Sequence, residues 1–179
     1  MWIFGYGSLI WNPGFEFESS VVGTLSNYHR SFCIRSIQAR GTLERPGLGL
    51  ALTACPGATC QGVAFCVTPR VAAKVLEYLR ARELSSSVYD EQTVPLALID
   101  GRRVEAVTYV ANTAHPEFVT GLSPDDQARL IAGASGQRGP NSEYLLNTSN
   151  HLAALGIDDP ELTALARRVV TLIATPTPG

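Results

Sequence analysis

The sequence predicts an α+β fold, in which strands fill the first two thirds of the chain and helices fill the last third. Strand-like segments follow one another up to about residue 111, and helical patterns dominate from residue 123 onward. One helical segment, 69–83, interrupts the strands. Because strands and helices do not alternate regularly, a doubly wound nucleotide-binding sheet is disfavoured.

Length and composition indicate one globular domain. The chain has 179 residues, of which 45% are hydrophobic and 17% charged, and this balance argues against wholesale disorder. We predict a single domain over residues 1–174 and a frayed tail at 175–179. The formal net charge of −2, without clustered lysines and arginines, argues against nucleic acid as a partner.

The first eleven residues are strongly apolar, so they need a separate interpretation. They lack a basic leading region and are interrupted by Gly5, Gly7 and Ser8. This pattern predicts neither a signal peptide nor a membrane span. We expect a buried strand that runs into a tight loop, a cytoplasmic protein, and no membrane partner.

Alternating and apolar runs predict six strands. They cover residues 2–6, 21–36, 48–54, 61–67, 88–99 and 102–111. The turn at 56–59 predicts a hairpin, across which Cys55 and Cys60 could face each other. In a reducing cytosol we expect all four cysteines to be plain buried thiols. Asp100-Gly101 predicts a second hairpin with a two-residue turn.

Capping residues locate the helices. Thr68 is the expected N-cap of the helix 69–83, with Pro69 at its first position. Ser123 and the acidic residues that follow begin a helix that runs to about residue 134. A third helix spans 141–155 and stops at Gly156, and Asp159 opens the last one, which ends near residue 173.

Glu83 is the first candidate for chemistry. The helix 69–83 has one apolar stripe, formed by Val71, Ala72, Val75, Leu76 and Leu79. Glu83 projects between Ala72 and Leu76, inside this stripe. A carboxylate that faces a core is costly unless paired, and burial raises its pKa, which suits a general base. The pattern leaves an alternative open, in which Glu83 sits at a fraying helix end and turns to solvent or pairs with Arg82.

The second candidate is a glycine-rich loop directly after the first strand. It comprises Gly5, Tyr6, Gly7, Ser8 and Leu9, and we call it the glycine loop. Its glycines allow close approach to a ligand, and its N–H groups could hold an anion or an oxyanion. Ile10 stands where a dinucleotide fingerprint needs glycine, and the GxSxG pattern of a nucleophile elbow is absent. A glycine turn without a ligand remains the alternative.

Two further patterns concern Arg40 and metals. Arg40 lies in a long loop between strands, where it could contact a substrate or simply brace the loop. The four cysteines form no CxxC pair, and the three histidines are scattered. We therefore predict no metal site.

In order and spacing, these motifs resemble the ChaC family of γ-glutamylcyclotransferases over nearly the whole chain. The matching blocks are FGYGSLIW at 4–11, RSF at 30–32, RGT at 40–42, PG at 46–47, GVAF at 62–65, RE at 82–83, VY at 88–89, GPN at 139–141, EYL at 143–145 and LGI at 155–157. The resemblance is to the bacterial branch. One departure is the sequence 84–87, Leu-Ser-Ser-Ser, where many eukaryotic members carry a glycine pair.

The resemblance implies both a fold and a site. The fold would be a small mixed β-barrel with one inserted helix and C-terminal helices packed around it. Glu83 would match the catalytic base, the glycine loop the γ-glutamyl-binding loop, and Tyr89 a tyrosine near the substrate. We add Arg40 as a candidate substrate-binding residue.

The implied reaction is the cleavage of glutathione to 5-oxoproline and cysteinylglycine, with no metal or other cofactor. Two alternatives stay open: a cyclotransferase for other γ-glutamyl amines or dipeptides, and a non-catalytic metabolite-binding regulator linked to cation transport. A serine hydrolase that uses Ser8 is disfavoured, because the nucleophile elbow is missing.

Overall fold

The computed structural model describes residues 1–175. Apart from Thr175, the predicted frayed tail lies outside the described residues. The contacts divide the chain into two compact units, each built from two stretches. The first unit comprises Met1–Ser31 and Ala51–His115, and the second comprises Phe32–Leu50 and the chain from Pro116 onward. The prediction of a single domain over residues 1–174 stays a prediction.

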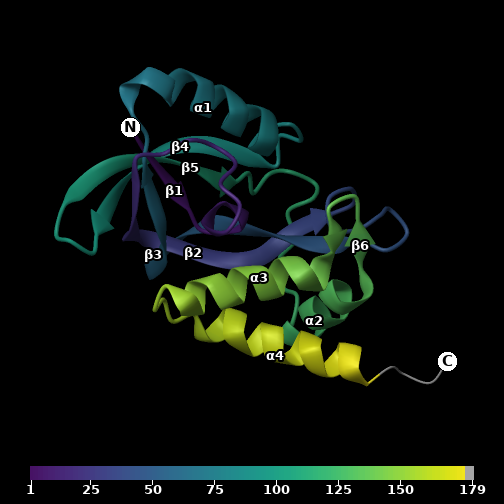
Figure 1. Ribbon diagram of the computed structural model, residues 1–179. Coiled ribbons are helices and arrows are strands. Elements are labelled where there is room, and N and C mark those ends of the chain that lie inside the picture. Colours follow the sequence, from purple (N-terminus) through teal and green to yellow (C-terminus); the bar gives the residue numbers. More distant parts are fainter. Residues whose placement is uncertain (176–179) are drawn as a thin grey trace. The chain divides into compact units, whose positions relative to one another are not determined.

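Five strands close into a mixed barrel (Figure 1). They are β1 (Trp2–Gly5), β2 (Ser19–Ser36), β3 (Gly47–Cys66), β4 (Tyr89–Leu98) and β5 (Arg103–Ala111), in the barrel order β1-β3-β2-β4-β5. β1 pairs with β3 antiparallel and with β5 parallel, which gives it neighbours on both sides. This explains its continuous apolar sequence, since both faces and both edges are covered. The predicted α+β fold with a small mixed barrel is confirmed.

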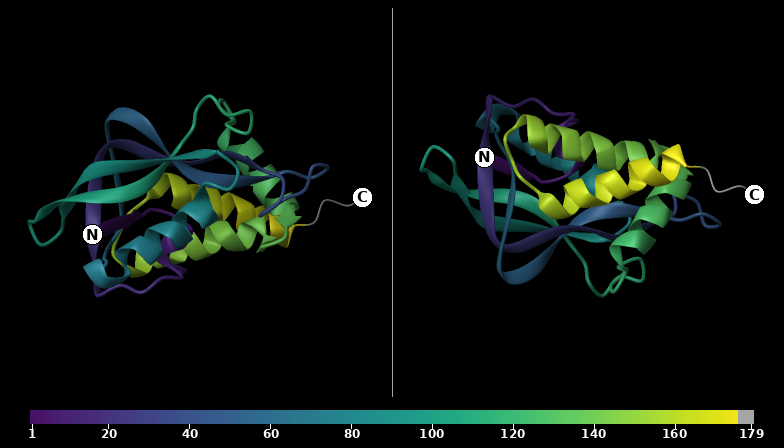
Figure 2. Two further views of the ribbon diagram at one scale, coloured as in Figure 1. Left: turned by 90° about the horizontal axis from the view of Figure 1, so that it is seen from above. Right: turned by 90° about the horizontal axis from the view of Figure 1, so that it is seen from below.

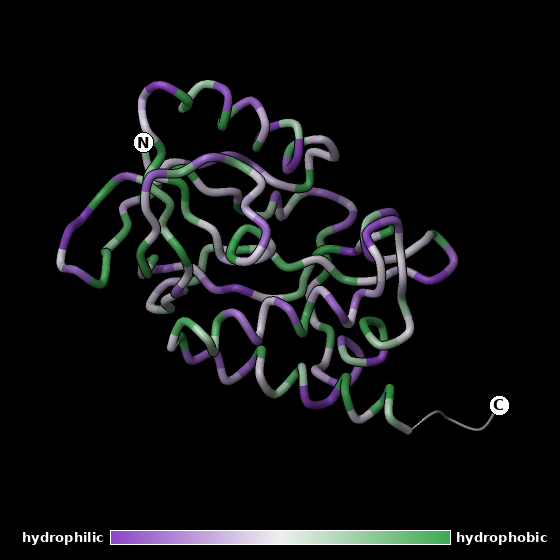
Figure 3. Tube along the Cα trace, in the orientation of Figure 1, coloured by the Kyte–Doolittle hydropathy of each residue, from purple (hydrophilic) through white to green (hydrophobic). Residues whose placement is uncertain are grey.

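The inserted helix α1 (Pro69–Glu83) has the bounds that the sequence predicts. Thr68 is its N-cap residue, but the Thr68 hydroxyl makes no capping bond and is buried without a hydrogen-bond partner among the described residues. The helix buries Val75 and Leu79 against a cluster of the first unit that also contains Ile3, Leu9, Val63, Phe65, Val67 and Tyr109. Figure 3 shows hydrophilic and hydrophobic residues succeeding one another along α1, as expected for a helix with one buried face.

The predicted hairpin at 56–59 is wrong, because β3 continues through it as one strand. Gly57 adopts a φ of +83°, and its N–H donates to Asn27 Oδ1 of β2 at 3.0 Å. The Pro-Gly sequence therefore marks an irregularity within a strand, a position where both residues are tolerated. No hairpin turn separates Cys55 from Cys60, because both lie in β3. All four cysteines are free thiols, but the expectation that all are buried is wrong for Cys55, which is exposed, and for Cys66, which is half-buried.

The hairpin between β4 and β5 is confirmed, but its turn is longer than predicted. The Leu98 N–H donates to the Arg102 carbonyl, which leaves the three residues 99–101 in the turn. Gly101 alone supplies the left-handed conformation, with a φ of +89°. Three residues with glycine in this position form a common hairpin turn, in which Asp100 need not adopt positive φ.

The second unit contains the C-terminal helices α2 (Pro124–Gly133), α3 (Asn141–Ala154) and α4 (Pro160–Ala174). α3 and α4 lie side by side (Figure 2). The predicted caps are present: Ser123 Oγ accepts from the Asp126 N–H, and Asp159 Oδ1 from the Leu162 N–H. Gly156, with a φ of +72°, ends α3 as predicted.

One feature of the second unit is not among the elements predicted from the sequence. This is the two-residue strand pair β6 (Ser135–Gly136) and β7 (Gly139–Pro140), which leads into α3. Within residues 1–175, none of the helices combines the length and the apolar character that crossing a bilayer requires.

Candidate active site

The glycine loop is anchored by buried hydrogen bonds in the first unit. The Tyr6 side chain is buried, and its hydroxyl donates to the Tyr109 carbonyl at 2.8 Å. The Tyr6 carbonyl accepts from Arg30 Nη1 at 2.9 Å, and the same nitrogen donates to the Gln61 carbonyl at 3.0 Å. The loop is thus fixed to the barrel through both the side chain and the backbone of Tyr6.

Gly5 is required by close packing. A Cβ atom at Gly5 would lie 2.8 Å from the Leu9 Cβ and 3.2 Å from the Phe65 ring. Directly after it, the chain forms the short 3₁₀ helix η1 (Ser8–Ile10), in which the Ile10 N–H donates to the Gly7 carbonyl at 2.9 Å. The first N–H groups of such a turn have no acceptor within the turn itself, so they are available for other partners.

Glu83 is the last residue of α1, and its side chain is 20% exposed. Glu83 Oε1 lies 3.0 Å from Arg82 Nε, so the pairing that the sequence left open as an alternative is present. The charge of the carboxylate also acts on Tyr109, which belongs to the buried cluster beneath α1. Burial, followed by the charge and hydrogen bond of Glu91 and the charge of Glu83, raises the pKa of Tyr109 far above its usual value. The Tyr109 hydroxyl therefore stays protonated and donates to Glu91 Oε2 at 3.2 Å.

Arg82 connects the end of α1 to the glycine loop. Its Nη2 donates to Ser8 Oγ at 2.8 Å, and its Nη1 donates to the carbonyls of Asn12 at 2.9 Å and Pro13 at 3.2 Å. The two candidates that the sequence singled out, Glu83 and the glycine loop, are thus brought together in one unit. No role for Arg82 in joining the two was predicted from the sequence.

Tyr89 belongs to the same unit. It opens β4 opposite Ala111 of β5 and packs, half-buried, against the core cluster that contains Leu9 and Leu79. Between α1 and β4, Ser87 adopts a φ of +56°, which is uncommon for a residue other than glycine. The loop that departs from the family pattern at 84–87 therefore ends in a left-handed residue.

Arg40 belongs to the second unit and is engaged there by the segment that leads into α3. Its Nη1 donates to the carbonyls of Arg138 and of Pro140, the latter at 3.1 Å. Its guanidinium carbon lies 5.2 Å from the centre of the Tyr144 ring. Burial lowers the pKa of Arg40. These contacts are those of a residue that braces its loop, and a role in substrate binding stays a prediction.

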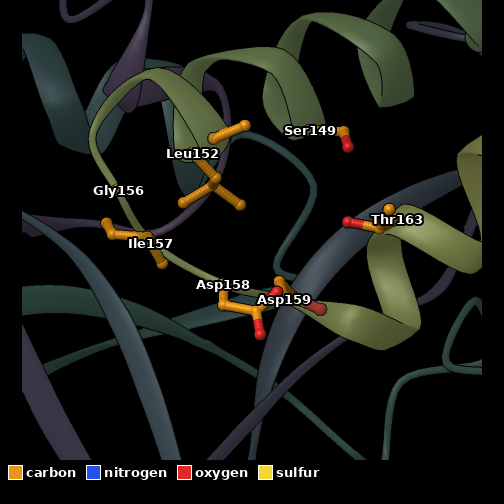
Figure 4. A pocket seen from close by; sticks show the side chains of 8 residues that line it. Ser149, Leu152, Gly156, Ile157, Asp158, Asp159 and Thr163 are labelled. Carbon is orange, nitrogen blue, oxygen red and sulfur yellow. The ribbon is translucent and has the colours of Figure 1, made fainter.

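A cavity of about 250 Å³ lies in the second unit, where α3 ends and α4 begins (Figure 4). Its lining includes Ser149, Leu152, Asp158, Asp159 and Thr163, and none of the predicted site residues. Asp159 is already used there as the N-cap of α4. Among residues 1–175, no group of three or more histidine, cysteine or acidic side chains is placed to hold a metal ion.

The family model described as ChaC-like protein matches residues 1–172. The chain belongs to this family, and the resemblance found in its motifs is confirmed. A glutathione-specific γ-glutamylcyclotransferase of Escherichia coli K12 is 40% identical over 174 residues, which cover 97% of this chain and 74% of that protein. The human glutathione-specific γ-glutamylcyclotransferase 1 is 33% identical, with 97% of this chain and 80% of that protein covered.

A solved structure has the same fold. The crystal structure of a γ-glutamylcyclotransferase specific to glutathione from yeast matches with a TM-score of 0.85 and 25% identity. The match covers 97% of this chain and 99% of that one.

Proposed function

We propose that this chain is a glutathione-specific γ-glutamylcyclotransferase that converts glutathione to 5-oxoproline and cysteinylglycine, with Glu83 as the general base. One observation carries the proposal: a single unit joins the glycine loop to the carboxylate of Glu83 through Arg82. The relatives named as glutathione-specific cyclotransferases support the same reaction and a small-molecule substrate. The predicted cytoplasmic location stays a prediction.

The γ-glutamyl group would bind beside the glycine loop. Backbone N–H groups of the loop hold its α-carboxylate, which suits a segment rich in glycine and fixed at Tyr6. Tyr89, which packs against the same cluster as Leu9, would contact the substrate from β4. Binding in a folded shape brings the α-nitrogen close to the γ-carbonyl carbon of the same molecule, and this proximity supplies much of the acceleration.

Glu83 would transfer protons from the α-nitrogen to the leaving cysteine nitrogen. Its carboxylate takes a proton from the α-ammonium group, and the neutral amine attacks the γ-carbonyl carbon to close a five-membered ring. The tetrahedral intermediate collapses when the bond to the cysteine nitrogen breaks. In total, two protons leave the α-nitrogen and two arrive on the cysteine nitrogen, so Glu83 can accept and return them in turn.

The oxyanion that develops on the γ-carbonyl needs hydrogen-bond donors in a site from which water is partly excluded. N–H groups of the glycine loop would serve as these donors, and losing one such donor typically costs about 3 kcal/mol of transition-state stabilisation. Because nucleophile and electrophile belong to one molecule, the route has no covalent enzyme intermediate. Ser8 is not a nucleophile in this scheme, because the substrate's own α-amine attacks; the Ser8 hydroxyl accepts a hydrogen bond from Arg82.

The test is to incubate the purified chain with glutathione, and in parallel with γ-glutamyl-alanine, and to measure the products by mass spectrometry. We expect 5-oxoproline and cysteinylglycine from glutathione and little product from the dipeptide. Turnover of the dipeptide alone would retain the chemistry but refute the substrate. A folded sample that converts neither compound would refute the proposed function and favour the metabolite-binding alternative.

A further inference from the structure

We propose that Arg82 is a positioning residue for this reaction. It holds the glycine loop close to the Glu83 carboxylate, so that both can act on one substrate. The inference rests on the proposed function and extends it to a residue that would not itself touch the substrate. The Arg82 side chain is only 10% exposed, so its charge is largely withdrawn from water. A guanidinium in this environment needs specific partners.

Those partners are found along one continuous segment of the chain. The two terminal nitrogens of Arg82 donate to Ser8 Oγ and to the carbonyls of Asn12 and Pro13. Arg82 Nη1 also lies 3.1 Å from the hydroxyl of Tyr78, one helical turn earlier on α1. The partners of Arg82 are up to 74 residues away in sequence, so Arg82 joins the end of α1 to a segment that is remote along the chain.

The segment is fitted closely to the helix at a second point. Gly14 has a φ of +73°, and a Cβ atom there would lie 2.1 Å from the Tyr78 hydroxyl oxygen. Tyr78 and Arg82 are four residues apart, so they lie on the same face of α1. The segment 8–14 therefore packs on this face of α1, and Glu83 is the residue directly after Arg82.

The contact with Glu83 differs in kind from the contacts with the loop. Arg82 Nε is buried and finds no hydrogen-bond partner among the described residues, although Glu83 Oε1 lies 3.0 Å away. The pair is held by charge, without the alignment of a hydrogen bond. The guanidinium thus keeps the carboxylate nearby without a directed hydrogen bond from Nε, which suits a base that must turn to a substrate nitrogen.

A lysine at position 82 could not make the same set of contacts. The planar guanidinium presents its donors in a fixed fork and reaches Ser8, Asn12 and Glu83 at once, whereas a lysine has one nitrogen. Arg82→Lys should therefore retain the charge but release the loop. A displacement of about 1 Å at a reacting centre costs roughly 100-fold in rate.

The experiment compares Arg82→Lys and Arg82→Gln with a matched control, Arg70→Lys. Arg70 lies in the first turn of α1, and its exposed ion pair with Glu16 joins the same helix to a residue just beyond the segment 8–14. We expect Arg82→Lys to lower kcat about 100-fold with little change in KM, and Arg70→Lys to match the wild type. Arg82→Gln also removes the positive charge, so it should move the acid limb of the kcat/KM profile to higher pH.

A merely structural arginine would lower the melting temperature without moving the pH profile. Arg82→Lys within threefold of the wild-type kcat, or Arg82→Gln with an unchanged profile, overturns the inference. A wild-type chain without turnover overturns the proposed function first and the inference with it. An active wild type with an equally active Arg82→Lys overturns the inference alone.

If the Arg82 variants fold poorly, a double-mutant cycle with Ser8→Ala still tests the inference. Ser8→Ala is a mild change, because it removes only one hydrogen-bond acceptor of Arg82. If Arg82 acts through Ser8, Ser8→Ala lowers kcat by itself, and the double variant is little slower than Arg82→Lys. Full activity of Ser8→Ala, or strictly additive effects, contradicts the proposal.

Discussion

The Tyr6 hydroxyl donates a 2.8 Å hydrogen bond to the backbone carbonyl of Tyr109, and both residues are buried. The bond joins the loop that follows β1 to β5, the strand with which β1 pairs in parallel. The glycine loop is therefore an extension of the barrel and holds its shape before any substrate arrives. Such preorganisation is what an oxyanion-binding loop requires.

Removing this hydroxyl should destabilise the fold. We expect Tyr6→Phe to lower the free energy of unfolding by about 1–2 kcal/mol, because it leaves the buried Tyr109 carbonyl without this donor. Urea denaturation measures the effect, with Tyr28→Phe as a control in which a half-buried hydroxyl loses its bond to Gln92. Equal stability of Tyr6→Phe and the wild type would contradict the anchoring role of Tyr6.

The ion pair between Arg80 and Glu91 predicts a pH dependence of stability. Two hydrogen bonds from Arg80, at 2.7 and 2.8 Å, and a further one from Tyr109 hold the pKa of Glu91 below its usual value. The pKa is lower in the folded state than the value of about 4.3 in the unfolded chain. The contribution to stability is therefore present above about pH 4 and is lost as the pH falls through the folded pKa.

Glu91→Gln should lower the free energy of unfolding at pH 7 by about 1 kcal/mol, a small effect because Arg80 is half-exposed. The difference from wild type should shrink as the pH falls below about 4, where Glu91 itself becomes protonated. Chemical denaturation at several pH values measures this, with Asp90→Asn as a control at an exposed neighbour. A difference that stays constant down to pH 3 would show that the charge of Glu91 is not responsible.

Asn141 should matter most for the second unit. Its side-chain amide is fully buried, accepts from the Leu48 N–H at 2.6 Å and donates to the Leu48 carbonyl at 2.8 Å. Asn141→Ala leaves both buried main-chain groups unpaired, so we expect about 3 kcal/mol less stability. Asn150→Ala, at an exposed position of the same helix, serves as the control. Thermal unfolding of Asn141→Ala at the wild-type temperature would contradict this assignment.

Local signals explain which elements the sequence predicted correctly. α1 has its predicted bounds. Ser123 and Asp159 cap the first turns of α2 and α4 with their side chains, and Gly156 follows the end of α3 with a positive φ. The prediction failed in β3, where Pro56-Gly57 is a turn signal by local rules. The strand continues there because Gly57 bonds to Asn27 on the neighbouring strand, 30 residues earlier in the chain. Such long-range pairing overrides local preference.

The same distinction holds for the candidate site. Periodicity placed Glu83 on the inner face of α1, and glycine spacing marked the loop after β1. Arg82 and Tyr109 were missed, since their partners are remote: Arg82 bonds to Asn12 across 70 residues and Tyr109 to Tyr6 across 103. The available signal was the arginine beside the predicted base, which the sequence analysis considered only as a possible partner of Glu83.

The most direct test of the central claim follows the fate of glutathione in water enriched in ¹⁸O, with the wild-type chain and with Glu83→Gln. Cyclisation incorporates no solvent oxygen, so wild type should yield unlabelled 5-oxoproline and cysteinylglycine. Glu83→Gln should fold normally by circular dichroism and retain less than about one per cent of the rate, because a general base contributes roughly 100- to 10,000-fold. Labelled glutamate as the first product, or a Glu83→Gln variant that retains substantial activity, would contradict intramolecular cyclisation driven by Glu83.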